Sequence, residues 1–509
     1  MLLLGIDLGT SSVKVSVLEA QTQNCIASVH YPETEADIIS AQPGWAEQSP
    51  DLWWENVKQA ILKCNATNLY DSNNIAAIGI AYQMHGLVLV DKDQHVLRNS
   101  IIWCDSRAVE IGNEAFANIG NEKCLYHLLN SPGNFTASKL AWVKQHEPAV
   151  YEKIDKVMLP GDFIAMKFTG DITTTASALS EGIFWDYRSN NISFDINNYF
   201  GFDQSLFPQI QTLFAPHGLL KETVAARLSL KTGIPVSYKA GDQPNNALSL
   251  NVLQPGEVAA TAGTSGVIYG VSDQLEYDQQ SRINSFVHVN HKAPSPLGRA
   301  GGEVRIGILL CINGSGIFNR WVKNLIGTNR TYAELNQAAS IIKPGANGLL
   351  ALPFGNGAER MLNNLQVGAH FQNLDFSIHT DAHLVRAAQE GVAFAFRYGL
   401  DIMRENGMNP TIIRAGKANL FLSDVFTRSF VNSTNVAIEF YDGDGSYGAA
   451  LGAGIGAGIY NHAADAFGNR KPTGCIEPQE KNNSEELYQQ WKSFLQEKLQ
   501  TVNEQIQMA

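Results

Sequence analysis

Two Gly-Thr-Ser turns, one in each half of the chain, carry residue types suited to binding phosphate. The first turn is Gly9-Thr10-Ser11 and the second turn is Gly263-Thr264-Ser265. Apolar runs flank both turns, which is typical of β-hairpins, and each turn offers hydroxyl and backbone N–H groups to an anion. Asp7 precedes the first turn, whereas Ala262 precedes the second. Either turn alone would be an ordinary surface hairpin, but the pair with one carboxylate predicts a nucleotide clamp with Mg²⁺ at Asp7.

Asp242 is the strongest candidate for a general base. It follows the apolar stretch Ile234–Ala240, and Gly241 beside it would let a substrate approach the carboxylate closely. In phosphoryl transfer, such a carboxylate orients or deprotonates the attacking hydroxyl group. The spacing is equally consistent with Asp242 as the cap of a following helix. Gln243, the next residue, is a candidate substrate contact.

Two predicted buried strands end in polar residues that could bind a polyol. Met84 and His85 follow the predicted strand Ile75–Ala81, and Asp105 and Arg107 follow a second strand at 100–103. Open α/β sheets place ligand contacts at such strand ends. The alternatives are a structural histidine in a buried loop and a simple surface ion pair.

Two glycine motifs were compared with known nucleotide-binding loops, and neither predicts a dinucleotide site or a Walker A loop. Gly443–Gly448 has the G-x-G-x-x-G spacing, but no second strand ending in a ribose-binding acid follows it. Its small residues, with the run Ala449–Ile459, instead favour a helix packed tightly against a sheet or nucleotide. Gly416-Lys417 is the only Gly-Lys pair, and it lacks the glycine spacing of a Walker A loop. If the chain uses ATP, we therefore expect the paired hairpins to bind it.

A chain of 509 residues is too long for one core, so two large domains must position these residues. We place the boundary near residue 247, giving domains at 1–247 and 248–509, because a Gln-Pro-Gly turn at 254–256 leads into the repeated hairpin. Ser49-Pro50 predicts the start of a helix with Trp53, Val57, Ile61 and Leu62 buried. Residues 137–250 are predicted to be mainly helical.

Two longer helices are predicted in the second half. One begins at Thr380 or Asp381, buries Leu384, Ala388, Val392, Phe396 and Leu400, and stops at Gly407. The other opens at Asn483 and carries an apolar stripe that is interpreted as core, with a homodimer contact as the alternative.

Composition excludes several classes of partner. The formal net charge is −12 and no block of Lys and Arg is present, which argues against nucleic acid and anionic membranes. Hydrophobic residues make up 44% of the chain, but none of them form a run long enough to span a bilayer. The 6 cysteines include no Cys-x-x-Cys pair, so neither zinc nor a disulfide framework is indicated. A small substrate and a reducing cytoplasm are expected.

The order of these motifs over nearly the whole chain resembles the FGGY carbohydrate kinases of the actin-like ATPase superfamily. The resemblance is carried by Gly5–Ser11, Trp45-Ala46-Glu47-Gln48, Gln83-Met84-His85-Gly86, Trp103-x-Asp105-x-Arg107, Gly241-Asp242, Gly263–Gly266, Leu352-Pro353-Phe354 and Glu359-Arg360.

The resemblance implies an α/β fold of two ribonuclease-H-like domains around a central cleft. It implies that the first domain binds mainly the sugar and the second mainly ATP. It further implies Asp242 as the base acting on the C5 hydroxyl of the sugar, Asp7 at Mg²⁺ and phosphate, and Met84 and His85 near the sugar. The Gln-Met-His-Gly run points to xylulose, with ribulose, gluconate and glycerol as alternatives.

Two segments depart from the family pattern. The turn expected near adenosine usually has three glycines in this family. In this chain the turn contains Gly416, Lys417 and Asn419. The loss of two glycines restricts how closely the backbone can approach the nucleotide. Pro244 and two asparagines replace the usual small residues after Asp242. Two other functions stay open, an actin-like ATPase switch and a sugar sensor that has lost catalysis.

Overall fold

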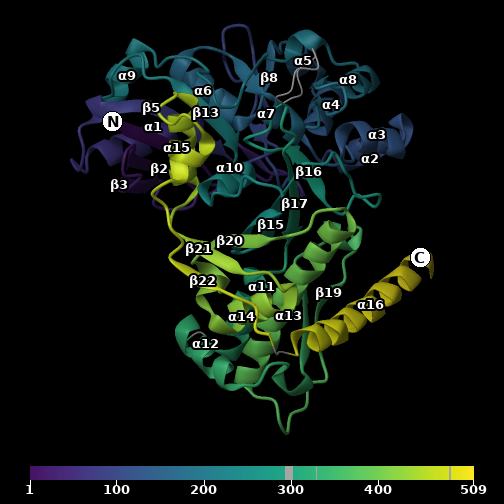
Figure 1. The fold of residues 1–509 in the computed structure, drawn as a ribbon. Coiled ribbons are helices and arrows are strands. Elements are labelled where there is room, and N and C mark those ends of the chain that lie inside the picture. The colour runs from purple at the N-terminus through teal and green to yellow at the C-terminus, as the bar shows by residue number, and fades with distance from the viewer. Residues whose placement is uncertain (293–301, 328, 481–482, 509) are drawn as a thin grey trace.

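The computed structural model describes residues 1–292, 302–327, 329–480 and 483–508. Two mixed sheets form the centres of its two halves (Figure 1). The first sheet has the order β13-β5-β1-β2-β3. Its strands are β1 (Leu2–Leu8), β2 (Val13–Glu19), β3 (Cys25–Tyr31), β5 (Ile75–Tyr82) and β13 (Val236–Gly241).

The second sheet has the order β16-β17-β15-β14-β20-β21-β22. Its strands are β14 (Glu257–Ala262), β15 (Gly266–Ser272), β16 (Asn284–Val287), β17 (Ile306–Ile312), β20 (Ile412–Gly416), β21 (Ile438–Tyr441) and β22 (Gly474–Ile476). In each sheet, an antiparallel hairpin is followed by a parallel neighbour: β1 pairs with β2 and β5, and β14 pairs with β15 and β20. The two predicted hairpins are therefore confirmed, with a Gly-Thr-Ser turn in each.

Residues 1–249 are all described by the structure, and outside the first sheet they contain ten helices and four small strand pairs. The helices are α1 (Pro50–Asn65), α2 (Val109–Ile119), α3 (Asn121–Leu128), α4 (Thr136–His146), α5 (Pro148–Tyr151), α6 (Pro160–Thr169), α7 (Ala176–Glu181), α8 (Phe194–Phe200), α9 (Glu222–Leu228) and α10 (Asp242–Ser249). The strand pairs are β4 (Glu47–Gln48) with β7 (Ser100–Ile101), β6 (Val88–Val90) with β8 (Lys156–Met158), β9 (Thr173–Thr175) with β12 (Gln209–Gln211), and β10 (Trp185–Asp186) with β11 (Asn191–Ile192).

The second half adds six helices and one hairpin in the described residues. These are α11 (Gly316–Ile326), α12 (Tyr332–Ile341), α13 (Asp381–Glu405), α14 (Asp424–Thr434), α15 (Gly445–Gly456), α16 (Ser484–Met508) and the pair β18 (Leu350–Phe354) and β19 (Gly368–Gln372). The 3₁₀ turns within the described residues are η1 (Ser72–Asn74), η2 (Gln204–Leu206), η3 (Ala346–Gly348), η4 (Arg360–Leu362), η5 (Asn419–Leu422) and η6 (Ala463–Phe467).

Local signals predicted the longer helices well. The Ser49 side chain caps α1 by accepting a hydrogen bond from the N–H of Leu52, and Trp53, Val57 and Ile61 are buried. Leu62 is only half-buried, and Ala60 and Cys64 complete the buried face instead. α13 begins after Thr380 and ends before Gly407, and Leu384 alone of its predicted stripe is half-buried. The stripe of α16 packs into the core of the second half, as interpreted.

The predicted strand at 100–103 is wrong in extent and in place. Only Ser100 and Ile101 are extended, and they pair with β4 rather than with the first sheet. Ser100, Ile101 and Ile102 of this run are buried, whereas Trp103 is 52% exposed.

Helix α15 belongs to the second half of the chain but packs on β1, β5 and β13 of the first sheet (Figure 1). Glycines make this approach possible. A Cβ at Gly5 would lie 1.8 Å from the carbonyl oxygen of Ser446, and one at Gly79 would lie 1.9 Å from that of Ala449. The prediction that the small residues after Gly443 permit close helix packing is thus confirmed.

We expect Gly79→Ala to destabilise the protein by about 3 kcal/mol, because the added methyl group would overlap a backbone oxygen that cannot move without displacing α15. Gly416→Ala is the matched control, since its Cβ would meet no atom within 4 Å. Thermal unfolding followed by circular dichroism measures both variants. Equal melting temperatures would contradict this account of the packing.

Candidate active site

Asp242 and Asp7 lie at the same edge of the first sheet. Asp242 begins α10 directly after β13, and Gly241 is paired with Tyr82 of β5. On the other side of β5, Asp7 of β1 is paired with Ala81. Two strand spacings therefore separate their backbones, roughly 10 Å. Burial and the negative charge of Asp7 raise the pKa of Asp242 to about 7.

The Asp7 carboxyl group also faces the first residue of α15. A Cβ at Gly445 would lie 2.3 Å from Asp7 Oδ2. Burial and the neighbouring Asp444 raise the pKa of Asp7 to about 6, against the opposing effect of Lys14. Asp7 and Asp444 are half-buried carboxyl groups that repel each other. Their oxygens are hard donors, and a divalent cation would balance their negative charge. These residues therefore fit Mg²⁺.

The two asparagines after Asp242 hold α10 in place. Asn245 Nδ2 donates a hydrogen bond to the carbonyl oxygen of Gly445 at 2.8 Å, and Asn246 Nδ2 donates to Thr261 Oγ1 at 3.3 Å. The first contact connects the helix bearing Asp242 to the helix that faces Asp7. This departure from the family pattern thus has a structural purpose that the sequence did not indicate.

Gly241 is needed for packing rather than for open access to the base. A Cβ at Gly241 would lie 2.6 Å from Met84 Cγ and 2.8 Å from Glu181 Oε2. The space beside this glycine is therefore filled by protein, which corrects the prediction that it admits substrate. Met84 is itself buried and borders the backbone that leads to Asp242.

His85 is held as a neutral hydrogen-bond acceptor. Its Nδ1 lies 2.9 Å from the carbonyl oxygen of Glu181, which can only accept, so Nδ1 carries the proton. Burial and the charge of Lys139 lower the pKa of His85 to about 3, which leaves Nε2 with a free lone pair. Lys139, which sequence reasoning missed, is completely buried and donates to the carbonyl oxygen of His85 at 2.9 Å.

Asp105 and Arg107 form a buried pair, so the surface interpretation is wrong. Their side chains are 0% and 1% exposed, and Arg107 Nη2 lies 2.7 Å from Asp105 Oδ2. The N–H of Ala46 also donates to Asp105 Oδ2, at 2.6 Å, and the guanidinium stacks 3.8 Å from the Trp45 ring centroid. With its oxygens enclosed, Asp105 cannot contact a sugar directly, which corrects its prediction as a substrate contact.

Both predicted phosphate turns present polar groups at the surface. Ser11, Thr264 and Ser265 are exposed. The Thr10 hydroxyl group donates to Gln83 Oε1 at 3.1 Å, so the first turn is tied to the end of β5. Gln243 Nε2 lies 3.3 Å from Asp242 Oδ2, which places this predicted substrate contact against the base.

A cavity of about 330 Å³ adjoins the second turn and brings Gly263, Thr264 and Asn419 together. The backbone N–H groups of Gly316 and Ile317, at the start of α11, donate to the carbonyl oxygens of Gly263 and Thr264 at 2.9 and 3.0 Å. The cavity is also lined by Asn319, Tyr332, Asn336 and Ser423, which sequence reasoning missed. Gly416, the last residue of β20, and Lys417, which follows it, do not line this cavity, whereas Asn419 does.

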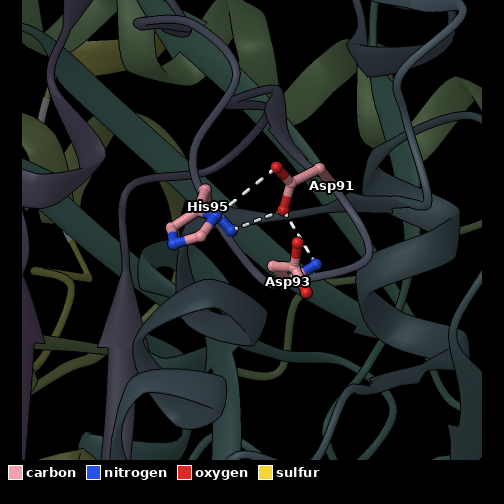
Figure 2. A group of neighbouring side chains, drawn as sticks. All are labelled: Asp91, Asp93 and His95. Atoms are coloured by element: carbon pink, nitrogen blue, oxygen red, sulfur yellow. Dashed lines mark hydrogen bonds and ion pairs between the residues drawn. The ribbon is translucent and has the colours of Figure 1, made fainter.

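A separate group of possible metal ligands, Asp91, Asp93 and His95, was not predicted (Figure 2). Asp91 Oδ1 accepts hydrogen bonds from the N–H groups of Asp93 and His95 at 2.9 and 2.8 Å. These contacts are those of an aspartate that closes a tight turn. The group includes neither Asp7 nor Asp242 and is explained by the turn alone.

Residues 2–249 match the model of the FGGY family of carbohydrate kinases, N-terminal domain. These residues therefore form an N-terminal domain of this family. The chain is 28% identical over 470 residues to a xylulose kinase of Bacillus subtilis (strain 168), with 90% of this chain and 88% of the relative covered. It is 29% identical over 454 residues to a xylulose kinase of Escherichia coli (strain K12), with 88% of each covered.

Solved structures confirm the fold of the chain. A xyloylose kinase from Brucella ovis superposes with a TM-score of 0.86 at 25% identity, covering 97% of this chain and 98% of that one. A gluconate kinase from Lactobacillus acidophilus superposes with a TM-score of 0.88 at 19% identity, covering 99% of both. The predicted α/β fold with two ribonuclease-H-like domains is therefore correct, and the shared fold does not select the sugar.

Proposed function

We propose that this ATP-dependent sugar kinase phosphorylates xylulose on its C5 hydroxyl group. The observation that carries the proposal is the placement of Asp7 and Asp242 at one edge of the first sheet, with the pKa of each raised toward neutrality. The xylulose kinase names of the relatives support this choice of sugar.

Each residue of the proposed site has a distinct task. Asp242 accepts the proton of the attacking hydroxyl group, and a base with a pKa of about 7 suits transfer near neutral pH. His85 Nε2 accepts a hydrogen bond from another sugar hydroxyl group, while the two Gly-Thr-Ser turns bind the phosphates of ATP. Mg²⁺ held at Asp7 would neutralise charge on the phosphate oxygens.

Release of ADP in the presence of xylulose, ribulose, gluconate or glycerol tests this function directly. We expect kcat/KM for xylulose to exceed that for each other sugar by about tenfold or more, because missing or misplaced hydrogen bonds cost that much. Hydrolysis of ATP that is independent of sugar would favour an actin-like switch instead. Binding of sugar without any turnover would favour a sensor.

The described residues contain no helix with the length and apolar character needed to cross a bilayer. A small-molecule substrate is consistent with this finding. A homodimer through α16 stays a prediction.

A further inference from the structure

Arg360 brings a cation from the second half of the chain to the sugar side of the proposed site. It begins η4, and its Nη1 donates to the carbonyl oxygen of Ser281 at 3.2 Å. Its guanidinium carbon lies 5.8 Å from the centroid of the Phe135 ring, and a Cβ at Gly133 would lie 3.4 Å from its Nη2. Phe135 and Gly133 belong to the first half, so this side chain spans the two halves.

The surroundings of Arg360 connect it with the residues proposed to bind sugar. The Phe135 ring packs edge-on against the ring of His85, with centroids 4.9 Å apart. The positive charge of Arg360 contributes to the lowered pKa of His85. Burial raises the pKa of the Cys311 thiol, the charge of Asp242 raises it further, and the charge of Arg360 opposes this rise, so the guanidinium lies within electrostatic range of the region around the base.

Arg360 has no carboxylate partner within ion-pair distance in the part of the chain that the structure describes. Its neighbour Glu359 is completely buried and accepts hydrogen bonds from the N–H groups of Asn313 and Gly314 at 3.1 and 3.2 Å. Arg107, by contrast, is paired with carboxylates on both sides. A largely enclosed guanidinium that has only one carbonyl partner retains N–H donors for a ligand and is costly without one.

We propose, resting on the proposed function, that Arg360 binds the carbonyl oxygen of the sugar and so selects a ketose over the corresponding sugar alcohol. A guanidinium only donates, and a carbonyl oxygen only accepts. His85 Nε2 only accepts, so it takes a hydroxyl group. Arg360 therefore requires an acceptor and His85 requires a donor. This difference fixes the orientation of the sugar, with its carbonyl oxygen at Arg360 and a hydroxyl group at His85.

An aldonate would also satisfy Arg360, since a carboxylate is a strong acceptor. Its extra negative charge, however, would enter a site that already contains Asp7 and Asp242. Because like charges at close range are repulsive, the site favours a neutral carbonyl group.

The test compares xylulose with the pentitol formed by reducing its carbonyl group, in wild type and in Arg360→Met. We expect kcat/KM for xylulose to fall by about 50-fold in the variant, mainly through KM, because a charge-assisted hydrogen bond is lost. The value for the pentitol should change by less than about threefold, so the preference collapses. Arg360→Lys should retain part of the preference, and Arg428→Met, an exposed arginine of α14, should retain all of it.

Equal losses for ketose and pentitol in Arg360→Met, or no loss for either, would overturn the inference. If wild type phosphorylates no ketose, the proposed function fails, and calorimetry with xylulose alone decides the role of Arg360. Loss of xylulose binding in Arg360→Met, with a smaller loss in Arg360→Lys, would then support the contact, and unchanged binding in Arg360→Met would exclude it.

Discussion

Replacing Asp242 by asparagine is expected to lower kcat for sugar phosphorylation by about 1,000-fold, because the amide cannot accept the proton of the attacking hydroxyl group. The substitution keeps the size of the side chain and removes the charge that repels Asp7. The folded protein should therefore be at least as stable as wild type. Steady-state ADP release measures the loss of activity, and thermal unfolding measures the stability.

Two controls separate loss of the base from loss of the site. ATP affinity, measured by calorimetry, should change by less than about threefold, since the cavity beside the second turn does not include Asp242. Asp93→Asn removes an exposed carboxylate of the turn at 91–95 and should leave kcat unchanged. A residual kcat for Asp242→Asn within tenfold of wild type would refute the assignment of the base.

Replacing Asp7 by asparagine is expected to raise the Mg²⁺ concentration for half-maximal activity by about 100-fold. An amide oxygen carries no net charge, and one charge-assisted contact to a ligand contributes about this factor. Titration of activity with Mg²⁺ at saturating sugar and ATP measures the change. An unaltered metal response would remove Asp7 from this role.

The stability of the metal-free protein provides a second measurement for Asp7→Asn. Folding raises the pKa of Asp7 from 3.8 to about 6, so the folded state binds this proton more tightly than the unfolded state. Stability from this group is therefore greatest at low pH and is lost as the pH rises from about 4 to about 6. With EDTA present, the melting temperature of the variant relative to wild type should rise between pH 4 and pH 7. A difference independent of pH would contradict the raised pKa.

The elements recovered from sequence were those with strong local signals. α1 follows from Ser49 as cap and Pro50 as first helical residue, and α13 ends where Gly407 takes a positive φ of 82°. The hairpins follow from apolar runs around each turn. These features depend on residues close in the chain, so the sequence is sufficient to predict them.

The failed predictions share a dependence on distant contacts. Asp105 was predicted to contact a substrate, with a surface ion pair to Arg107 as the alternative, because nothing in their sequence neighbourhood shows that Trp45 covers the guanidinium. Gly241 looked open, because Met84 and Glu181 are far from it in sequence. The short extent of β7 reflects pairing with β4, which a strand pattern does not reveal.

The sequence by itself determined the two hairpin turns and the longer helices, since each depends on residue type and short-range spacing, and it offered Asp242 as a candidate base. Only the tertiary structure decided that α15 returns to the first sheet and faces Asp7, and that Arg360 crosses to Phe135. The physical reason is that burial and charge act through space. The pKa of Asp242 depends on Asp7, 235 positions earlier in the chain, which folding brings to the same sheet edge.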